Sequence, residues 1–167
     1  MLLGFEDETW LYVKPYITRT YMMKGEQQKI VHKGTKEKVN VFITLLYPLN
    51  KIKFNMTGKT RNSSDFINHL KNIQRYVLKR NIKRFILVID NASFHVSKKS
   101  TNYIKRQSEW LTVVYLPKKA PFLNPVETKV NRNLKKDICA NYCYETEEDL
   151  VGSVRRYLRR KGCWPKL

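Results

Sequence analysis

Three acidic residues stand where carboxylates from different parts of the chain could meet. Asp90 ends the apolar run "FILVI" of residues 85–89, Asp7 lies in the segment "FEDETWLYV", and Glu127 follows the motif "LNP". Carboxylates that converge at one end of a sheet repel one another, so we expect them to hold divalent cations. Their hard oxygen atoms suit Mg²⁺ or Mn²⁺, and two such ions would stabilise the attacking and leaving oxygens of a phosphodiester displacement. The three acids therefore predict metal-dependent cleavage of nucleic acid.

Each of these acids also has a purely structural interpretation. Asp7 could be a charge on an edge strand that opposes aggregation. Asp90 could cap the turn that an Asp-Asn dipeptide favours. Glu127 would occupy the third position of a helix with Asn124 as N-cap and Pro125 as first residue, where a capping contact is expected. Taken together, their order and placement favour the metal site.

The charge of the chain indicates a polyanionic partner. The 167 residues include 33 Lys and Arg against 14 Asp and Glu, which gives a formal net charge of +19 and a pI of about 10.0. Such an excess causes self-repulsion in the folded state, so nucleic acid is the favoured partner and an anionic membrane surface the weaker alternative. No apolar run approaches the roughly 20 residues that span a bilayer. We therefore expect a cytoplasmic protein.

The cysteines do not predict a zinc site. Cys139, Cys143 and Cys163 form an odd set without CxxC spacing, and no histidine stands near the first two in the sequence. Reduced thiols in a cytoplasmic protein are the expectation.

Hydrophobic alternation predicts three strands in the first part of the chain. Residues 5–13 alternate and include Trp10 and Tyr12, which favour strands. Residues 39–47 and 52–56 are two apolar runs separated by "PLNK", which indicates a β-hairpin. Three consecutive strands of this kind predict an antiparallel meander.

The second part of the chain alternates between helices and strands. Apolar residues at positions 66, 70, 73 and 77 define one face of a helix, for which Ser63 or Ser64 is the expected N-cap. Thr146 and Asp149 fit a capping box at the start of the last helix, whose first turn is acidic. The elements between these helices are expected to be a strand at 84–90, a short helix within 97–108, a strand at 111–116 and a helix after "LNP".

This order predicts an α/β fold in a single domain over residues 1–167. Three antiparallel strands followed by two strands joined through helices give a mixed five-stranded sheet flanked by helices. The order alone is compatible with several α/β folds.

Three sequence blocks favour one of these α/β folds. "FEDETW", "VIDNASFH" and "LPKKAPFLNPVE" resemble, in the same order, the signature blocks of the DDE transposases of the Tc/mariner superfamily, and in particular its bacterial and archaeal insertion-sequence branch. The resemblance implies an RNase H-like fold, with Asp7, Asp90 and Glu127 as a catalytic triad that binds two Mg²⁺ or Mn²⁺ ions. It also implies cut-and-paste transposition. Water cleaves DNA at the element ends, and the released 3′-hydroxyl attacks target DNA, usually at TA dinucleotides.

Residues beside the triad are further candidates for the site. Asn91 and His95 match the "DNAxxH" part of the second block, and His95 is expected either to position a phosphate or water or to be satisfied within its turn. Glu6 and Glu8 flank Asp7 but should point to the opposite face of the strand. The remaining candidates are Asn124 near the metals and, for DNA contacts, Lys98, Lys99, Lys118, Lys119, Arg132, Lys135 and Lys136.

The resemblance also implies partners. DNA would be bound at the transposon ends and at the target, with a homodimer as the working assembly. Full transposases carry a helix-turn-helix DNA-binding region before the catalytic domain. Since Asp7 lies so close to Met1, we expect that region to be absent here. The chain could then be the second reading frame of a split transposase, with a separate helix-turn-helix protein, a truncated remnant or a domesticated copy. The protein would be prokaryotic and associated with the nucleoid.

Two alternatives to an active transposase remain open. The chain could be a catalytically silent, basic DNA-binding remnant of a transposase. It could also be another RNase H-like nuclease, such as a junction resolvase or a nuclease of RNA–DNA hybrids.

Overall fold

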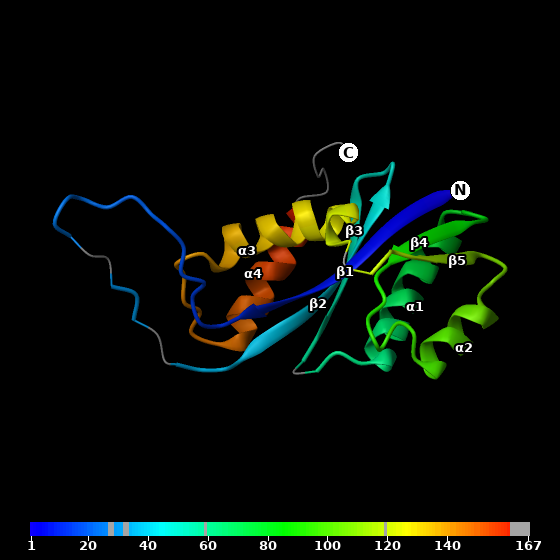
Figure 1. Cartoon of the computed structure of the whole chain (residues 1–167), viewed down its shortest axis with the longest axis horizontal. Helices are drawn as coiled ribbons and strands as arrows, with labels where there is room; N and C mark the ends of the chain where they lie inside the picture. The colour runs from blue at the N-terminus through cyan, green and yellow to red at the C-terminus, as the bar shows by residue number, and fades with distance from the viewer. Residues whose placement is uncertain (27–28, 32–33, 59, 119, 161–167) are drawn as a thin grey trace.

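A mixed five-stranded sheet forms the centre of the molecule, with strands in the order β3-β2-β1-β4-β5 (Figure 1). The computed structural model describes residues 1–167 except 27, 28, 32, 33, 59, 119 and 161–167. The strands are β1 (Leu2–Tyr12), β2 (Lys38–Tyr47), β3 (Lys51–Thr57), β4 (Phe85–Ile89) and β5 (Leu111–Tyr115). The helices are α1 (Ser63–Lys79), α2 (Lys98–Arg106), the 3₁₀ turn η1 (Pro121–Leu123), the π-helix η2 (Val126–Asn131), α3 (Arg132–Cys139) and α4 (Glu147–Arg160).

The strand pairing confirms the predicted α/β fold. β1 pairs antiparallel with β2 from Leu3–Tyr47 to Tyr12–Lys38, and β3 returns beside β2 as the second strand of a hairpin. β4 and β5 are added in parallel on the other side of β1. Both the meander and the mixed sheet are therefore confirmed, and β1 begins at Leu2, earlier than its sequence pattern indicated.

Helices cover both faces of the sheet (Figure 1). α1 and α2 pack on one face, over a core that includes Phe42, Phe66 and Phe85. η2, α3 and α4 pack on the other face, over a core that includes Ile43 and Leu134. β2 contributes to both cores because successive side chains of a strand alternate between the two faces. This position explains why β2 is a nearly continuous apolar run.

The predicted N-cap of α1 is wrong, and that of α4 is confirmed. Asn62, rather than Ser63 or Ser64, caps α1, because its Oδ1 accepts hydrogen bonds from the backbone N–H of Ser64 and of the residue that follows it. At the start of α4 the Thr146 Oγ1 accepts from the backbone N–H of Asp149 at 3.1 Å and donates to its carboxylate at 2.8 Å. The pair predicted from the sequence therefore caps the last helix.

The helix predicted after "LNP" is not regular along its whole length. It begins as the π-helix η2 and continues as α3. Short π-helical segments of this kind frequently occur at functional sites. Glu127 lies in η2, which makes this irregular segment relevant to the site.

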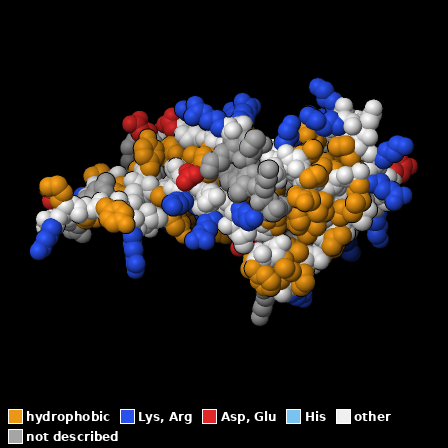
Figure 2. All heavy atoms as spheres, turned by 90° about the horizontal axis from the view of Figure 1, so that it is seen from above, with side chains coloured by type: hydrophobic (Ala, Val, Ile, Leu, Met, Phe, Trp, Pro, Cys, Tyr) orange, Lys and Arg blue, Asp and Glu red, His pale blue; other side chains and the backbone are white. Residues whose placement is uncertain are grey.

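Basic side chains outnumber acidic ones in the chain. On the face shown in Figure 2, Lys and Arg side chains stand out along the periphery, with few Asp and Glu side chains among them. The segment between β1 and β2 extends away from the sheet (Figure 1) and exposes Tyr21 and Met23. Within the described ranges, no helix is both long and apolar enough to cross a membrane.

Candidate active site

Asp7 and Asp90 become neighbours because β1 and β4 run parallel in a fixed register. Phe5 and Val88 form the last pair between the two strands, and Asp7 and Asp90 each lie two residues beyond it. β4 ends at Ile89, whereas β1 continues past the end of β4. The space beside the continuing strand is where the site forms.

Asn124 places Glu127 against the same end of β1. Its Nδ2 donates to the backbone oxygen of Glu6 at 2.7 Å, and its Oδ1 accepts from the backbone N–H of Val126 at 3.0 Å. Asn124 is buried, so both ends of its amide fix the start of η2 to the strand. Asn124 thus caps this helix as predicted, and the side chain of Glu127 remains exposed.

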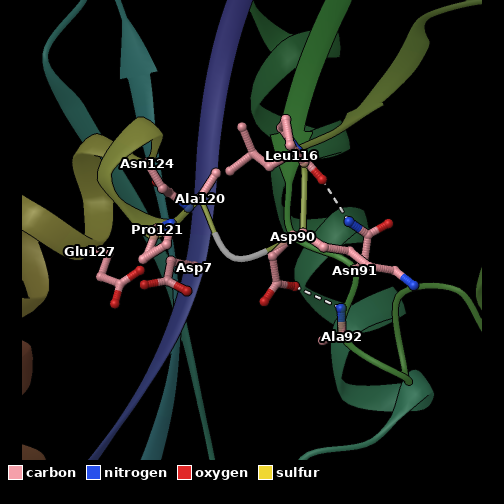
Figure 3. Close-up of a pocket in the computed structure, with 11 residues that line it drawn as sticks. Asp7, Asp90, Asn91, Ala92, Leu116, Ala120, Pro121, Asn124 and Glu127 are labelled. Atoms are coloured by element: carbon pink, nitrogen blue, oxygen red, sulfur yellow. Dashed lines mark hydrogen bonds between the residues drawn. The ribbon is translucent and has the colours of Figure 1, made fainter.

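The three predicted acids converge on one region. In Figure 3 the carboxylates of Asp7, Asp90 and Glu127 turn toward the space between β1, the end of β4 and η2. All three acids line two hollows. The first, here called the proline hollow, measures about 390 Å³ and is also lined by Asn91, Leu116, Pro117, Lys118, Pro121 and Asn124. The second, here called the tryptophan hollow, measures about 420 Å³ and is also lined by Glu8, Thr9, Trp10, Arg61, Asn131, Arg132 and Lys135.

Asp7 carries a charge that its surroundings repel. Burial, and after it the nearby carboxylates of Glu8 and Glu127, raise the pKa of Asp7 to about 7. Its hydrogen-bond donor is the neutral side chain of Asn131, whose Nδ2 lies 2.7 Å from Asp7 Oδ2. This position would therefore favour binding of a positive charge from outside the chain.

Asp90, by contrast, is held by hydrogen bonds. His95 Nδ1 lies 2.9 Å from Asp90 Oδ1. The backbone N–H of Ala92 donates to the same oxygen at 2.9 Å, as Figure 3 shows. The hydrogen bond from His95 is the main cause that holds the pKa of Asp90 below its ordinary value. Asp90 thus caps the turn after β4, as its structural interpretation predicted, and lines both hollows as well.

His95 connects Asp90 to acids on the opposite face of β1. Its Nε2 lies 2.8 Å from Glu8 Oε1 and 3.4 Å from Glu6 Oε2. Burial lowers the pKa of His95, but hydrogen bonds to Asp90 and Glu8 outweigh burial and raise it to about 10, so the ring is an imidazolium. The ring is buried and packs against Phe66. His95 is therefore paired with Asp90 in its own turn and with Glu6 and Glu8 on β1, and it lines neither hollow.

Glu6 and Glu8 point away from Asp7, as strand alternation predicted. Burial above all, and then the charge of Glu8, raise the pKa of Glu6 well above its ordinary value. Ligand atoms of Glu6, Glu8 and His95 lie within 4.8 Å of one another, so this group is a second place that could hold a cation. His95 already supplies a positive charge there, whereas the side chain bonded to Asp7 is neutral.

Some of the other predicted residues line one of the two hollows, and the rest lie outside both. Asn91 lines the proline hollow, and its Nδ2 donates to the backbone oxygen of Leu116 at 2.6 Å. Lys118 lines the same hollow, and Arg132 and Lys135 line the tryptophan hollow. Among the described residues, Lys98, Lys99 and Lys136 are exposed but line neither hollow, and Lys119 lies outside the described residues.

Three residues of the site are not among the predicted site residues, although Trp10 lies within the first sequence block. Trp10 and Arg61 line the tryptophan hollow, and Asn131 donates to Asp7. Asn131 stands four residues after Glu127, so helical spacing would have placed it on the same side. Arg61 precedes α1 in a loop, where no periodic pattern predicts its direction.

Two further expectations concern the strand edge and the thiols. Asp7 is not an edge-strand charge, and that interpretation is wrong, because β1 lies in the middle of the sheet. Cys139 is buried, which raises its pKa to about 11, and Cys143 is half-buried. Both are free thiols, and Cys163 lies outside the described residues.

Known proteins resemble this chain in sequence. The model of the family described as DDE superfamily endonuclease matches residues 3–151. The insertion element IS630 uncharacterized 39 kDa protein of Shigella sonnei is 26% identical over 161 residues, which are 96% of this chain and 46% of that protein. The chain thus spans about half the length of this curated relative.

Solved structures resemble it in fold. The Mos1 transposase paired-end complex with left transposon end has a TM-score of 0.74 at 14% identity and covers 95% of this chain and 48% of that chain. The catalytic domain of Mos1 mariner transposase has a TM-score of 0.67 at 15% identity and covers 95% of this chain and 70% of that chain. These likenesses confirm the predicted RNase H-like fold.

Proposed function

The chain belongs to the DDE superfamily endonuclease family, and we propose that it performs the DNA cleavage and 3′-hydroxyl strand transfer of a Tc/mariner-type transposase. The observation that carries this proposal is the convergence of Asp7, Asp90 and Glu127 at one end of the central sheet. Segments far apart in the sequence supply one acid each, inside a chain with a net charge of +19. A catalytically silent remnant is not favoured, because it would have no need for three acids in one place.

The three acids fit divalent metal ions. All three donors are carboxylates, whose hard oxygens suit Mg²⁺ and Mn²⁺. The pKa of Asp7, raised to about 7 by burial and by neighbouring carboxylates, reflects negative charge that an ion would compensate. Mos1 paired-end complexes with Mn and with Mg are among the similar structures. We infer that Asp7, Asp90 and Glu127 hold two ions, which when bound would stabilise the charges on the attacking and leaving oxygens.

The chain's own residues would hold these ligands in place. His95 fixes the carboxylate of Asp90 through its Nδ1, and Asn131 orients that of Asp7. Asn124 ties η2 to β1 and so keeps the helix that carries the third acid beside the strand. Positioning of this kind reduces the reorganisation needed when the substrate binds.

DNA is the proposed substrate. Phosphate contacts dominate the affinity of proteins for DNA, and the basic surface of this chain suits them. Lys118, Arg132 and Lys135 line the hollows and are the predicted basic residues best placed for such contacts. We propose transposon ends and target DNA as ligands, a homodimer as the working assembly, a helix-turn-helix protein as a further partner, and the nucleoid of a prokaryote as the location.

A nicking assay tests the proposal. Purified chain is incubated with a supercoiled plasmid that carries the DNA flanking the gene, in Mg²⁺ or Mn²⁺. Glu127→Gln should reduce cleavage by a factor on the order of 10²–10³ or more, because it removes one charged ligand. Glu127 is exposed, so its substitution should leave the fold intact. Glu109→Gln, an exposed carboxylate between α2 and β5, is the matched control and should cleave like the wild type.

Two results would contradict the proposal. The first is cleavage by Glu127→Gln at the wild-type rate. The second is complete inactivity of folded wild-type protein over a range of metals and DNA ends. Preferred cleavage of RNA–DNA hybrids or of junctions would instead favour another RNase H-like nuclease.

A further inference from the structure

The two hollows that share the three acids have different walls. The proline hollow is lined largely by apolar and neutral side chains, with Lys118 as its described cation. Besides the three acids, the tryptophan hollow is lined by Glu8, Thr9, Trp10, Asn131 and three cations, which are Arg61, Arg132 and Lys135. Among the described residues, more cations therefore line the tryptophan hollow than the proline hollow.

Trp10 attracts two of these cations without neutralising them. The guanidinium carbon of Arg61 lies 4.7 Å from the centroid of the indole ring, and Lys135 Nζ lies 5.7 Å from it. Cations are attracted to the negative face of such a ring. Among the described residues, neither Arg61 nor Lys135 forms a salt bridge, although the charge of Arg61 contributes to lowering the pKa of Asp90. Their charge remains available for an anion.

The cations that meet at Trp10 come from opposite faces of the sheet. Arg61 stands just before α1, which packs on one face, and Lys135 belongs to α3, which packs on the other. Trp10 lies near the end of β1 and is 40% exposed, and cations from both layers approach its ring. A long side chain held against a ring has fewer conformations to lose when it binds a ligand.

We propose that the tryptophan hollow binds the backbone phosphates of the DNA strand that leaves the acids on this side. Arg61, Arg132 and Lys135 are the donors, and Trp10 is the platform that orients two of them. Arginine offers a planar fork of donors that matches a phosphate, and lysine adds a point charge. The inference rests on the proposed function for the identity of the strand. It predicts that DNA is bound more tightly on the tryptophan side of the acids than on the proline side.

DNA binding without metal tests this inference. The probe is a fluorescent duplex with a single-stranded 3′ extension, measured by anisotropy in EDTA over a series of salt concentrations. The double variant Arg61→Gln/Lys135→Gln should bind about 10-fold more weakly at about 0.1 M salt. The slope of log K against log salt concentration should fall by about 1 to 2, because one or two phosphate contacts are lost.

Two further variants separate the site from net charge. Lys105→Gln/Arg106→Gln removes one lysine and one arginine from the exposed last turn of α2, and should weaken binding by less than about 3-fold. Trp10→Leu leaves the net charge unchanged, and should weaken binding by about 3-fold because Arg61 and Lys135 lose their platform. Thermal unfolding of each variant checks that the fold is intact.

The outcomes distinguish this inference from the proposed function. Equal losses in the two double variants, or wild-type affinity in Trp10→Leu, would overturn the inference. Intact cleavage together with binding that does not depend on Arg61 and Lys135 would count against the inference alone. Binding that depends on them, in a protein that never cleaves, would count against the proposed function alone.

Discussion

The two faces of β1 carry the same kind of side chain in opposite surroundings. On one face Glu6 and Glu8 share the imidazolium of His95. On the other face Asp7 meets further carboxylates and a neutral Asn131, and its pKa is raised to about 7. Acids that share a counter-charge inside the protein have less need of a cation from outside than acids whose nearest donor is neutral. The position of the counter-charge, more than the number of acids, distinguishes a metal site from a buried ion pair.

Asp90 interacts with the acids of both faces of β1. It accepts a hydrogen bond from His95 and also lines the two hollows beside Asp7 and Glu127. The ion pair on one face therefore orients a proposed ligand on the other. Such outer contacts to metal ligands commonly change metal affinity or activity when they are removed.

The largest difference in cleavage rate is expected between two variants that each replace one acid by its amide, one on each face of β1. Asp7→Asn should reduce the single-turnover rate of DNA cleavage by about 10³-fold, because it removes a charge at the reacting phosphate. Glu8→Gln should keep at least about a tenth of the wild-type rate, because Glu8 is not one of the three proposed ligands and acts on them only through His95 and through its charge. Equal losses in the two variants would show that the faces do not differ as described.

Removal of the shared counter-charge should have the next largest effect. His95→Gln leaves buried acids without their cation, so the free energy of unfolding should fall by about 3 kcal/mol or more in urea titrations. Cleavage should fall by about 10- to 100-fold, because Asp90 loses its hydrogen bond. His69→Gln is the control, since His69 is also buried but bonds to Thr44, and cleavage should be almost unchanged.

A double variant shows whether the ion pair causes this loss. His95→Gln combined with Glu8→Gln should recover part of the stability, because the uncompensated charge is removed with its partner. No recovery would mean that the packing of the imidazole ring, rather than its charge, stabilises this face.

The pH dependence of the free energy of unfolding, measured without metal, tests whether the charge of Asp7 destabilises the fold. The pKa of Asp7 is about 7 in the folded protein and about 3.9 in an unfolded chain, so ionisation opposes folding. Its stabilising contribution is complete below about pH 4 and is lost as the pH rises to about 7. Asp7→Asn should therefore be more stable than the wild type at pH 8, by at most about 4 kcal/mol.

Thermal unfolding in EDTA between pH 5 and pH 8 measures this difference. The advantage of Asp7→Asn should grow with pH, and added Mn²⁺ should raise the melting temperature of the wild type alone. A difference that does not vary with pH would contradict the assignment of the destabilisation to the charge of Asp7.

The smallest effect is expected from the neutral partner of Asp7. Asn131→Ala removes the hydrogen bond to Asp7 Oδ2, so Mn²⁺ affinity should fall by about 3- to 10-fold and stability by about 1 kcal/mol. Asn133→Ala, in the same helical region, is the control. Unchanged affinity in Asn131→Ala would show that Asp7 is oriented by other contacts.

Much of the site was predictable because its acids stand at the ends of regular patterns. Asp90 follows an apolar strand, and Asn124 and Pro125 mark the start of the helix that carries Glu127. Helical and alternating periods likewise predict the order of the elements, since each pattern is local. The cap of α1 shows the limit of such patterns, because three adjacent polar residues could have served and the backbone conformation selects Asn62.

The counter-charges could not be predicted in the same way. His95 meets Glu8 only because β1 and β4 share a register and α1 packs beside them, which no local pattern contains. Arg61 and Lys135 meet at Trp10 from opposite layers of the fold for the same reason. Contacts between distant segments depend on how the elements pack.

Calorimetric titration of Mn²⁺ into wild type, Asp7→Asn and Glu8→Gln at about pH 7.5 tests the central claim most directly. The wild type and Glu8→Gln should bind the ion, whereas Asp7→Asn should lose binding, because the uncompensated acids lie on the Asp7 face. Binding retained in Asp7→Asn but lost in Glu8→Gln would place the cation with Glu6, Glu8 and His95 and would contradict the account.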